Sequence, residues 1–432
     1  MRERYDVIVV GSGSAGSAAA ISAARLGART LLMDRMPFMG GTSTAVLDTF
    51  YAFYTPGEAP RRVVGGLGWE VVERLTADGV AFERPNTYGA GTGVTYDQEV
   101  LKVLWERLAD DAEVELLLHT WATGVRVTEG RAAAVRTWNK GGERWVEANA
   151  IVDASGDADL CALAGVAYDD AAAMGRVQSL STLFKLANVD LERAASVPKA
   201  QLWELMAQAA ASGSYRLPRI EGSWHRTPYP GVVLIHMTRV PNVDATDPEQ
   251  LTRAEVEGRR QVREYARFLR DRVPGFEASV VVATSPGIGV RESRRVHGDY
   301  QLTREDVLGA RRFADEIALC GAPIEDHHAG GDTAWSYVAE SGVYGIPYRS
   351  LLPASVDGLL VAGRCFSATH DAHASARSMA TCMAMGQAAG TAAALAVRGG
   401  TTPRALDPEM LRSTLADASA LLEPLDVSVV VS

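Results

Sequence analysis

Cysteine is scarce in this chain of 432 residues, and its spacing excludes several kinds of site. The four cysteines, Cys161, Cys320, Cys365 and Cys382, lie far apart in the sequence. None of them forms the CxxC pair that is typical of zinc sites, iron–sulfur sites and thiol redox motifs. The same spacing gives no disulfide framework, so we expect a reducing, cytoplasmic location.

An excess of positive charge and a long uninterrupted apolar run are also lacking. Lys and Arg number 43 against 53 Asp and Glu, and the net charge of −10 argues against nucleic acid as the main partner. MRERYD leads directly into the first expected strand, so we expect no signal peptide. The apolar stretch that follows is interrupted by glycine and serine, so we expect no membrane span. The length allows two or three domain-sized units.

Residues 5–34 are the most informative segment, because they predict a dinucleotide-binding βαβ unit. A buried strand is followed by a glycine-rich turn, an alanine-rich helix and a second strand that ends at Asp34. The first glycine allows a tight turn, the second lets the backbone approach a pyrophosphate, and the third lets helix and strand pack closely. Asp34 can accept hydrogen bonds from a ribose hydroxyl. The residues of the turn are Gly11, Ser12, Gly13, Ser14, Ala15 and Gly16.

Capping residues and periodicity predict further elements along the chain. Asp97 and Asp247 are expected to begin helices, and Thr303 with Asp306 has the spacing of a capping box. The other expected elements are a β-meander over 114–152, a buried strand over 358–363 and a helix of small residues over 379–397.

Three distant segments together resemble the FAD-dependent oxidoreductases of glutathione-reductase-like fold. They are GSGSAG, VDASGDADLCALAG and GLLVAGRCFSATHDAHASARSMATCMAMGQAAGTAAALA. The segment SPGIGVRESRRVHGDYQLTREDVLGARRFADEIA resembles a central motif of the same family. Within that fold, the chain is most similar to a broad, mostly uncharacterised family related to the fumarate reductase and aspartate oxidase flavoproteins. The resemblance covers residues 5–45, 145–168 and 284–397.

The resemblance implies an α/β fold with a glutathione-reductase-type FAD-binding Rossmann domain that contains a β-meander. An α+β substrate or cap domain would be inserted into it. We expect a discontinuous FAD domain over 1–165 and 350–400, a cap over 166–349 and a tail over 401–432. A second strand–GxGxxG–helix unit is lacking, so we expect no separate NAD(P)H domain.

The resemblance also implies which residues hold FAD. Small residues after Asp34 would lie beside the isoalloxazine ring, and the start of the last long helix would stabilise negative charge on the flavin. Arg364 replaces the aspartate of many relatives, so either Arg364 or backbone amides would hold the ribityl chain, or Arg364 would neutralise the pyrophosphate. The loop has no histidine, so we expect non-covalent FAD, with Cys365 as the less favoured covalent alternative. Beyond the turn and Asp34, the expected cofactor residues are Arg35, Gly41, Thr42, Ser43, Ala154, Ser155, Gly156, Gly363, Arg364, Ser378, Met379 and Ala380.

Catalysis on a small polar substrate needs a cation that holds an anionic group and a residue that moves a proton. Arg377 and Arg291 suit the first task, and His370 or Tyr344 suits the second. The alternative for the two arginines is pairing with nearby acids such as Glu292 or Asp371, and the alternative for the histidine is a cap or core hydrogen bond.

No metal site is expected. His327 and His328 are adjacent, but no third ligand follows at a suitable spacing.

The expected function is hydride transfer between a small organic substrate and flavin N5, with the electrons passed to oxygen, a quinone or a protein carrier. The enzyme could form a homo-oligomer. One alternative is an electron-transfer subunit like the heterodisulfide reductase flavoprotein, although the scattered cysteines argue against bound clusters. Another is a tRNA-modifying flavoprotein, although that would require a basic surface on an acidic chain.

Overall fold

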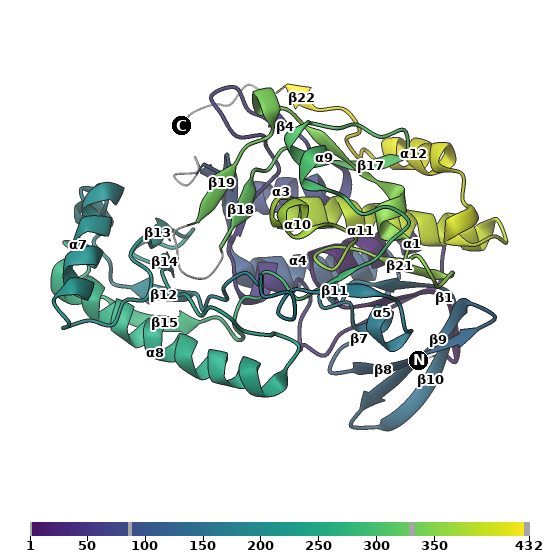
Figure 1. Cartoon of the computed structure of the whole chain (residues 1–432), viewed down its shortest axis with the longest axis horizontal. Coiled ribbons are helices and arrows are strands. Elements are labelled where there is room, and N and C mark those ends of the chain that lie inside the picture. The colour runs from purple at the N-terminus through teal and green to yellow at the C-terminus, as the bar shows by residue number, and fades with distance from the viewer. Residues whose placement is uncertain (1, 85–88, 328–332, 427–432) are drawn as a thin grey trace.

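The computed structural model describes residues 2–84, 89–327 and 333–426. Its larger unit is built on a seven-stranded sheet in the order β7–β2–β1–β10–β9–β8, in which β21 also pairs with β10 (Figure 1). The parallel part consists of β1 (Arg4–Val10), β2 (Thr30–Met33), β7 (Glu115–Leu117), β21 (Leu359–Val361) and the second half of β10 (Gly142–Asp153). The first half of β10 continues into an antiparallel meander with β9 (Arg131–Asn139) and β8 (Trp121–Thr128). This is the mixed α/β architecture that the sequence predicts.

Two helices from opposite ends of the chain pack against each other beside this sheet. They are α1 (Ser14–Arg25) and α11 (Met379–Arg398). By length and composition α11 could cross a membrane, but 89% of its apolar window is buried inside the protein. Its apolar residues therefore serve the core.

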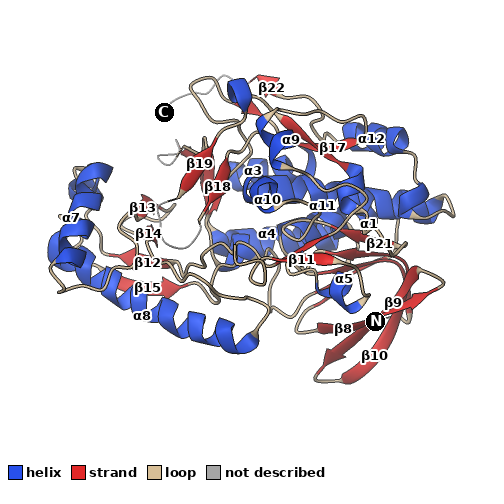
Figure 2. Cartoon of the chain, in the orientation of Figure 1, coloured by secondary structure: helices blue, strands red, loops and turns tan. Residues whose placement is uncertain are grey.

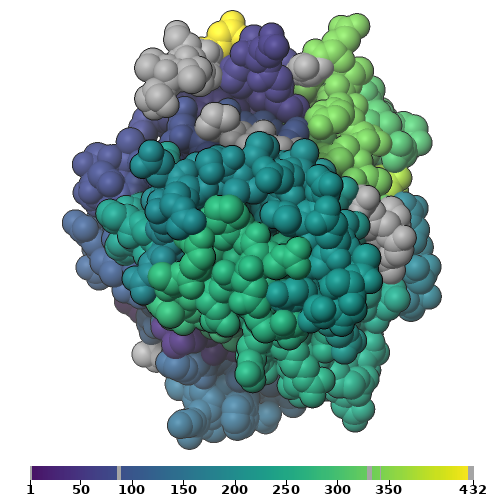
Figure 3. All heavy atoms as spheres, turned by 90° about the vertical axis from the view of Figure 1, so that its left-hand side faces the viewer, coloured from purple at the N-terminus to yellow at the C-terminus, as the bar shows by residue number. Residues whose placement is uncertain are grey.

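A second, smaller unit has a core of its own. Its antiparallel sheet has the order β13–β14–β12–β15, and helices α7 and α8 lie beside it (Figure 2). The bounds are β12 (Phe184–Ala187), α6 (Leu191–Ala195), α7 (Lys199–Ala211), β13 (Ser223–Arg226), β14 (Val233–His236), α8 (Pro248–Arg272) and β15 (Val280–Thr284). Figure 3 views the molecule from the side of this unit, whose teal and green atoms fill most of the visible face.

The core of the second unit contains buried residues between 184 and 276, whereas Val296, Tyr344 and Leu411 belong to the main core. Much of the segment 294–347 and the C-terminal helix α12 (Pro408–Asp417) therefore pack with the larger unit. The elements of this region are β16 (Arg294–Val296), α9 (Arg304–Leu308), β17 (Glu316–Cys320), β18 (Ile324–Asp326), β19 (Ala334–Ser336), β20 (Tyr344–Pro347) and α10 (His370–Ala376).

Local capping is as the sequence predicts. The side chain of Asp97 accepts hydrogen bonds at the start of α4 (Gln98–Asp111), and Asp247 does the same for α8. Thr303 and Asp306 form a complete capping box at α9. The remaining short elements are α2 (Thr42–Ala45), β3 (Thr49–Phe50), β4 (Arg61–Arg62), α3 (Gly66–Ala77), β5 (Ala81–Arg84), β6 (Gly93–Tyr96), α5 (Asp159–Leu163), β11 (Tyr168–Asp170) and β22 (Leu425–Asp426).

Candidate active site

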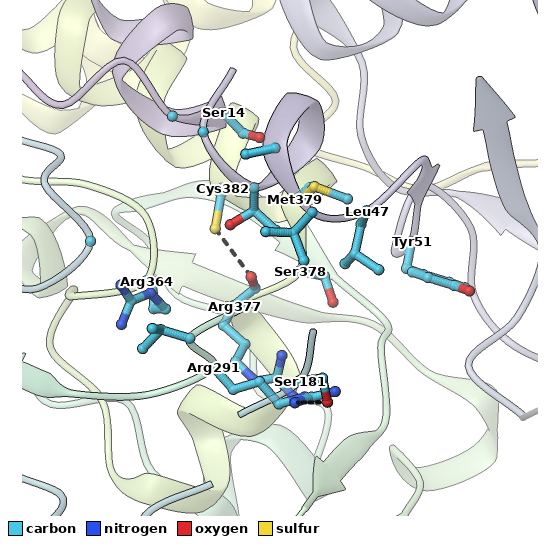
Figure 4. A pocket seen from close by; sticks show the side chains of 18 of the residues that line it. Ser14, Leu47, Tyr51, Ser181, Arg291, Arg364, Arg377, Ser378, Met379 and Cys382 are labelled. Atoms are coloured by element: carbon cyan, nitrogen blue, oxygen red, sulfur yellow. Dashed lines mark hydrogen bonds between the residues drawn. The ribbon is translucent and has the colours of Figure 1, made fainter. Parts of the chain in front are cut away.

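A cleft extends from the carboxyl ends of the parallel strands to the second unit, and Figure 4 shows some of the side chains that line it. Gly11 follows β1, Ala154 follows β10 and Ala362 follows β21, and all three line the cleft. Ligands of open α/β sheets bind at this edge. Of the expected cofactor residues, the cleft is lined by Gly11, Gly13, Ser14, Ala15, Asp34, Arg35, Gly41, Thr42, Ala154, Ser155, Gly156, Gly363, Arg364, Ser378 and Met379. Ser12, Gly16, Ser43 and Ala380 do not line it, and all four are buried.

The glycine-rich turn has the geometry of a phosphate cradle. Gly11 has a φ of 94°, and a Cβ there would lie 2.4 Å from the carbonyl oxygen of Ala154. A Cβ on Gly16 would lie 1.7 Å from the carbonyl oxygen of Gly11, whereas one on Gly13 would meet nothing within 4 Å. Gly13 caps α1 without a side-chain hydrogen bond. The first amides of α1 are therefore left to a ligand, and the open space beside Gly13 fits a pyrophosphate.

Asp34 lies half-buried at the wall of the cleft. Its Oδ2 accepts hydrogen bonds from the backbone nitrogen of Ser12 at 2.5 Å and from Ser12 Oγ at 2.9 Å. Its Oδ1 accepts from the backbone nitrogen of Met36 at 2.8 Å. A carboxylate has about four acceptor positions, so capacity remains for a ribose hydroxyl. The same carboxylate fixes the conformation of the glycine-rich turn.

Arg364 lies at the cleft but already has a carboxylate partner. Its guanidinium donates to Asp157 Oδ1 at 2.8 Å and to Ser293 Oγ at 2.9 Å. Burial by itself would raise the pKa of Asp157, but Arg364 and Ser293 hold it below the usual value. Because its charge is largely offset, Arg364 is better suited to donate hydrogen bonds than to serve as a free cation.

The thiols offer little for covalent attachment of a cofactor. Cys365 is completely buried and does not line the cleft. Cys382 does line it, but burial raises the pKa of its thiol to about 12. A thiolate is the reactive form of cysteine, and at neutral pH this thiol stays protonated.

Arg291 and Arg377 reach the same cleft from different parts of the chain (Figure 4). Arg291 donates to the carbonyl oxygen of Ser179 at 2.5 Å, to Ser181 Oγ at 3.0 Å and to His236 Nε2 at 2.9 Å. All three acceptors are neutral groups. Burial and the nearby Arg377 lower the pKa of Arg291 to about 9.

Arg377 likewise donates to neutral oxygens, Gln178 Oε1 at 3.0 Å and the backbone oxygen of Glu325 at 3.5 Å. Neither arginine has an ion pair with Glu292 or Asp371 in the described chain. Glu292 is bonded to Arg295 and His370, and Asp371 pairs with other arginines. The charges of the two cleft arginines therefore remain available to a ligand.

Further polar residues of the cleft come from segments without a recognisable motif. Arg219 is 5% exposed, and its guanidinium has no hydrogen bond or ion pair with residues 2–84, 89–327 or 333–426. The cleft is also lined by His225, His236, Glu325 and His327. In the sequence these residues could have been noticed only because of their residue types. They come together only in space, when the second unit packs against the larger one.

His370 and Tyr344, the two expected proton-transfer residues, do not line the cleft. Tyr344 is completely buried, its hydroxyl lies 2.6 Å from Ser375 Oγ, and burial raises its pKa well above the usual value. His370 Nδ1 lies 2.9 Å from Glu292 Oε1 and its Nε2 lies 3.3 Å from Asp326 Oδ1. Burial by itself would lower the pKa of His370, but these two carboxylates raise it to about 9. The imidazolium is thus held in a buried ionic network.

Asp326, His370 and Asp371 bring three ligand atoms within 4.8 Å of one another. A protonated imidazole has no lone pair for a metal, and Arg176 and Arg304 pair with Asp371. These cations argue against a metal at this group. His328 lies outside the described residues, and its neighbour His327 is bonded to Glu325 and Thr333.

Comparison with known families identifies the chain. The family described as FAD dependent oxidoreductase matches residues 6–415. The chain belongs to this family. It is an oxidoreductase, and its cofactor is FAD.

A curated relative of this FAD-dependent oxidoreductase is the tRNA uridine 5-carboxymethylaminomethyl modification enzyme MnmG of Geobacter metallireducens. It is 28% identical over 164 residues. The match covers 35% of this chain and 24% of that enzyme. The similarity therefore spans about a quarter of the length of that relative.

A solved structure of a flavin enzyme shares the fold. A triple mutant of the flavin-dependent brominase Bmp2 superposes with a TM-score of 0.50 at 13% identity, covering 96% of this chain and 84% of that chain. The p-nitrophenol 4-monooxygenase PnpA of Pseudomonas putida gives a TM-score of 0.49 at 11% identity, covering 96% and 89%. At 13% identity the likeness to the brominase concerns the fold and not the substrate.

The residues of this oxidoreductase fit FAD in the part of the cleft that lies beside the carboxyl ends of the parallel strands. The glycine-rich turn and the start of α1 can receive the pyrophosphate, and Asp34 can receive the adenosine ribose. The start of α11, at Ser378 and Met379, lines the cleft beside Arg377. When bound, FAD supplies the two-electron chemistry.

Proposed function

We propose that the enzyme transfers a hydride between a small, carboxylate-bearing organic substrate and flavin N5. The FAD domain would have the glutathione-reductase-type arrangement, and the second unit would cover the substrate. The observation that supports this proposal is the set of three arginines in the wall of one cleft, of which Arg219 is buried and Arg291 and Arg377 are half-buried.

Removing a cation from water costs free energy unless a carboxylate pairs with it. Cations without such a partner are therefore expected where an anionic ligand binds and pairs with them. Arg291 and Arg377 donate only to neutral acceptors, and the side chain of Arg219 has no described partner. Glu325 is the neighbouring carboxylate, and its pKa is lowered to about 2 by His327 and the two arginines against the opposing effect of burial. Glu292 also lies near Arg377, but it is bonded to Arg295 and His370, so positive charge is left for an anionic substrate.

Arginine is suited to this task because its planar guanidinium can bind a carboxylate with two parallel hydrogen bonds. Arg377 directly precedes the flavin-facing start of α11, and Arg291 follows a loop that crosses from the second unit. Together they would orient the substrate between the two units. Such fixed orientation lowers the entropic cost of reaching the transition state.

The test mixes the FAD-loaded enzyme anaerobically with each member of a library of hydroxy, amino and saturated acids. Reduction of the flavin is measured as a loss of absorbance at about 450 nm, where oxidised flavin absorbs. Unsaturated acids are tested as oxidants of the dithionite-reduced enzyme. We expect a carboxylic acid to change the flavin spectrum and its amide or methyl ester to leave it unchanged. Equal reaction with the acid and its neutral derivative would refute the anionic substrate class.

A further inference from the structure

We propose that His225, held by Asp48, is the residue that takes up or returns the substrate proton in this cleft. The inference rests on the proposed function. When a hydroxy or amino acid is oxidised, its C–H bond breaks with the electron pair going to the flavin. Its O–H or N–H proton goes to His225 Nδ1 while the C=O or C=N bond forms. Reduction of the substrate is the reverse, with the proton returned from the imidazolium.

The histidine and the aspartate come from different units of the molecule. His225 lies on β13 of the second unit and lines the cleft, while Asp48 precedes β3 of the larger unit. His225 Nε2 and Asp48 Oδ1 are 2.7 Å apart. The aspartate is completely buried, and Thr49 Oγ1 donates to the same oxygen at 3.2 Å. The pair therefore forms only when the second unit is folded against the larger one.

This hydrogen bond decides which nitrogen of the imidazole is free. An ionised carboxylate accepts hydrogen bonds and cannot donate them, so Nε2 of His225 carries the hydrogen. Nδ1 then holds the lone pair, and it has no partner in residues 2–84, 89–327 or 333–426. A carboxylate that fixes the tautomer and stabilises the imidazolium is the arrangement that makes histidine an effective base.

The other two cleft imidazoles of the described chain are occupied. His236 Nε2 accepts from Arg291, and burial with the nearby arginines lowers its pKa well below the usual value. His327 lies between Glu325 at 3.0 Å and Thr333 at 3.0 Å, and burial with Arg291 lowers its pKa to about 3. Among these three histidines, only His225 has an acceptor nitrogen without a partner in the described chain.

Charged and titratable groups around His225 and Asp48 influence the pH dependence of the proposed proton transfer, because neighbouring charges favour or oppose the imidazolium form. Arg84 donates to Tyr51 at 3.2 Å and approaches Thr49, and burial raises the pKa of Tyr51. The titratable and charged groups that face the pair from the packed elements are Tyr51, Arg84, Tyr96 and His236.

The first experiment measures the single-turnover rate of flavin reduction against pH for the wild type, His225→Gln and Asp48→Asn, with an acid found in the screen. Glutamine keeps a donor for Asp48 but is not a base. We expect the rate of His225→Gln to fall by a factor of about 10² to 10³, with FAD bound, and the decline of the wild-type rate at acid pH to be absent. Imidazole should partly restore the rate of His225→Gly. An unchanged rate and pH profile in His225→Gln would overturn the proposal.

A matched control comes from a second histidine–aspartate pair of the chain. His297 Nε2 and Asp169 Oδ1 are also 2.7 Å apart, but His297 is largely exposed and does not line the cleft. His297→Gln should keep the wild-type rate and pH profile. A similar loss in both variants would show that the effect is structural and would overturn the proposed role.

The second experiment needs no substrate. Nitrogen NMR of the FAD-loaded enzyme, with His225→Gln used for assignment, should show the Nε2–H tautomer of His225, and Asp48→Asn should shift the population toward Nδ1–H. Observation of the Nδ1–H tautomer in the wild type would overturn the proposal. If no acid reduces the flavin, the proposed function fails, while this measurement still decides whether Nδ1 is available as a base.

Discussion

Gly386 of α11 lies directly against the backbone of Ala15 in α1. A Cβ on Gly386 would be 2.0 Å from the carbonyl oxygen of Ala15. One turn further on, a Cβ on Gly390 would be 1.9 Å from the carbonyl oxygen of Ala19. Both helices begin at the cleft, so this close contact sets the distance between the two helix starts that line it.

Gly386→Val should therefore push α11 away from α1. Overpacking of this kind costs about 1–3 kcal/mol of unfolding free energy, and we expect the upper end because the obstacle is backbone. FAD affinity should fall as well. Thermal and urea denaturation measure the first effect and fluorescence titration with FAD the second. Ala384→Val, at a half-buried position on the same helix, is the control. Equal stability of the two variants would contradict the prediction.

Gly13→Val should abolish FAD binding while the apoprotein stays folded. Gly13 has a φ of −64°, which any residue tolerates, and its Cβ would project into the space assigned to the pyrophosphate. Gly16→Ala is the matched variant, because its Cβ would collide with the carbonyl oxygen of Gly11 and destabilise the fold itself. Circular dichroism and release of yellow FAD on denaturation separate the two effects. A yellow Gly13→Val protein would refute the position of the pyrophosphate.

Asp34→Ala should weaken FAD binding by about 1.5–3 kcal/mol, the range for hydrogen bonds to charged groups. The carboxylate would hold the ribose, and it also accepts two hydrogen bonds from Ser12 that shape the turn. Isothermal titration with FAD and with riboflavin distinguishes these roles, since riboflavin lacks the adenosine. A loss of equal size for both ligands would assign the effect to a general disturbance of the cleft.

Arg377→Lys and Arg291→Lys should raise the KM for the acid by a factor of about 10 to 100, since lysine cannot form the two parallel hydrogen bonds of arginine. FAD should remain bound in both variants. Steady-state kinetics and the flavin spectrum are the measurements. Wild-type rates and KM in both variants would remove these two residues from the mechanism.

His370→Gln should remove a pH-dependent part of the stability. The pKa of His370 is about 9 in the folded protein against about 6.5 in an unfolded chain. Its contribution is therefore fully present below about pH 6.5 and is lost as the pH rises through about 9. The gap between wild type and variant should shrink over this range by at most about 3 kcal/mol.

Urea denaturation of the FAD-saturated enzyme at several pH values measures this gap. Asp326→Asn removes one of the two carboxylates that raise the pKa, so it should reduce the pH dependence. A gap between wild type and His370→Gln that stays constant with pH would contradict the assignment.

The sequence by itself determined the cofactor half of the enzyme. The spacing of the glycines at 11, 13 and 16 and the capping residues Asp97 and Asp247 follow local rules, and such rules can be read from sequence even where, as at Gly11, the neighbour that requires the glycine is distant in the chain. The family, the cofactor and the mixed α/β sheet could therefore be predicted. Arg291 and Arg377 were also expected in the site, by residue type and by resemblance.

The tertiary structure alone decided which polar side chains meet in the cleft. His225 and Asp48 stand far apart in sequence, and nothing local in either segment indicates that one will orient the other. Folding of the second unit against the larger one brings them to 2.7 Å and adds Arg219 to the cleft, whereas packing within the larger unit leaves Tyr344 and His370 in the interior. Burial and long-range charge, which set whether a side chain is free, paired or protonated, depend on distances in space rather than along the chain.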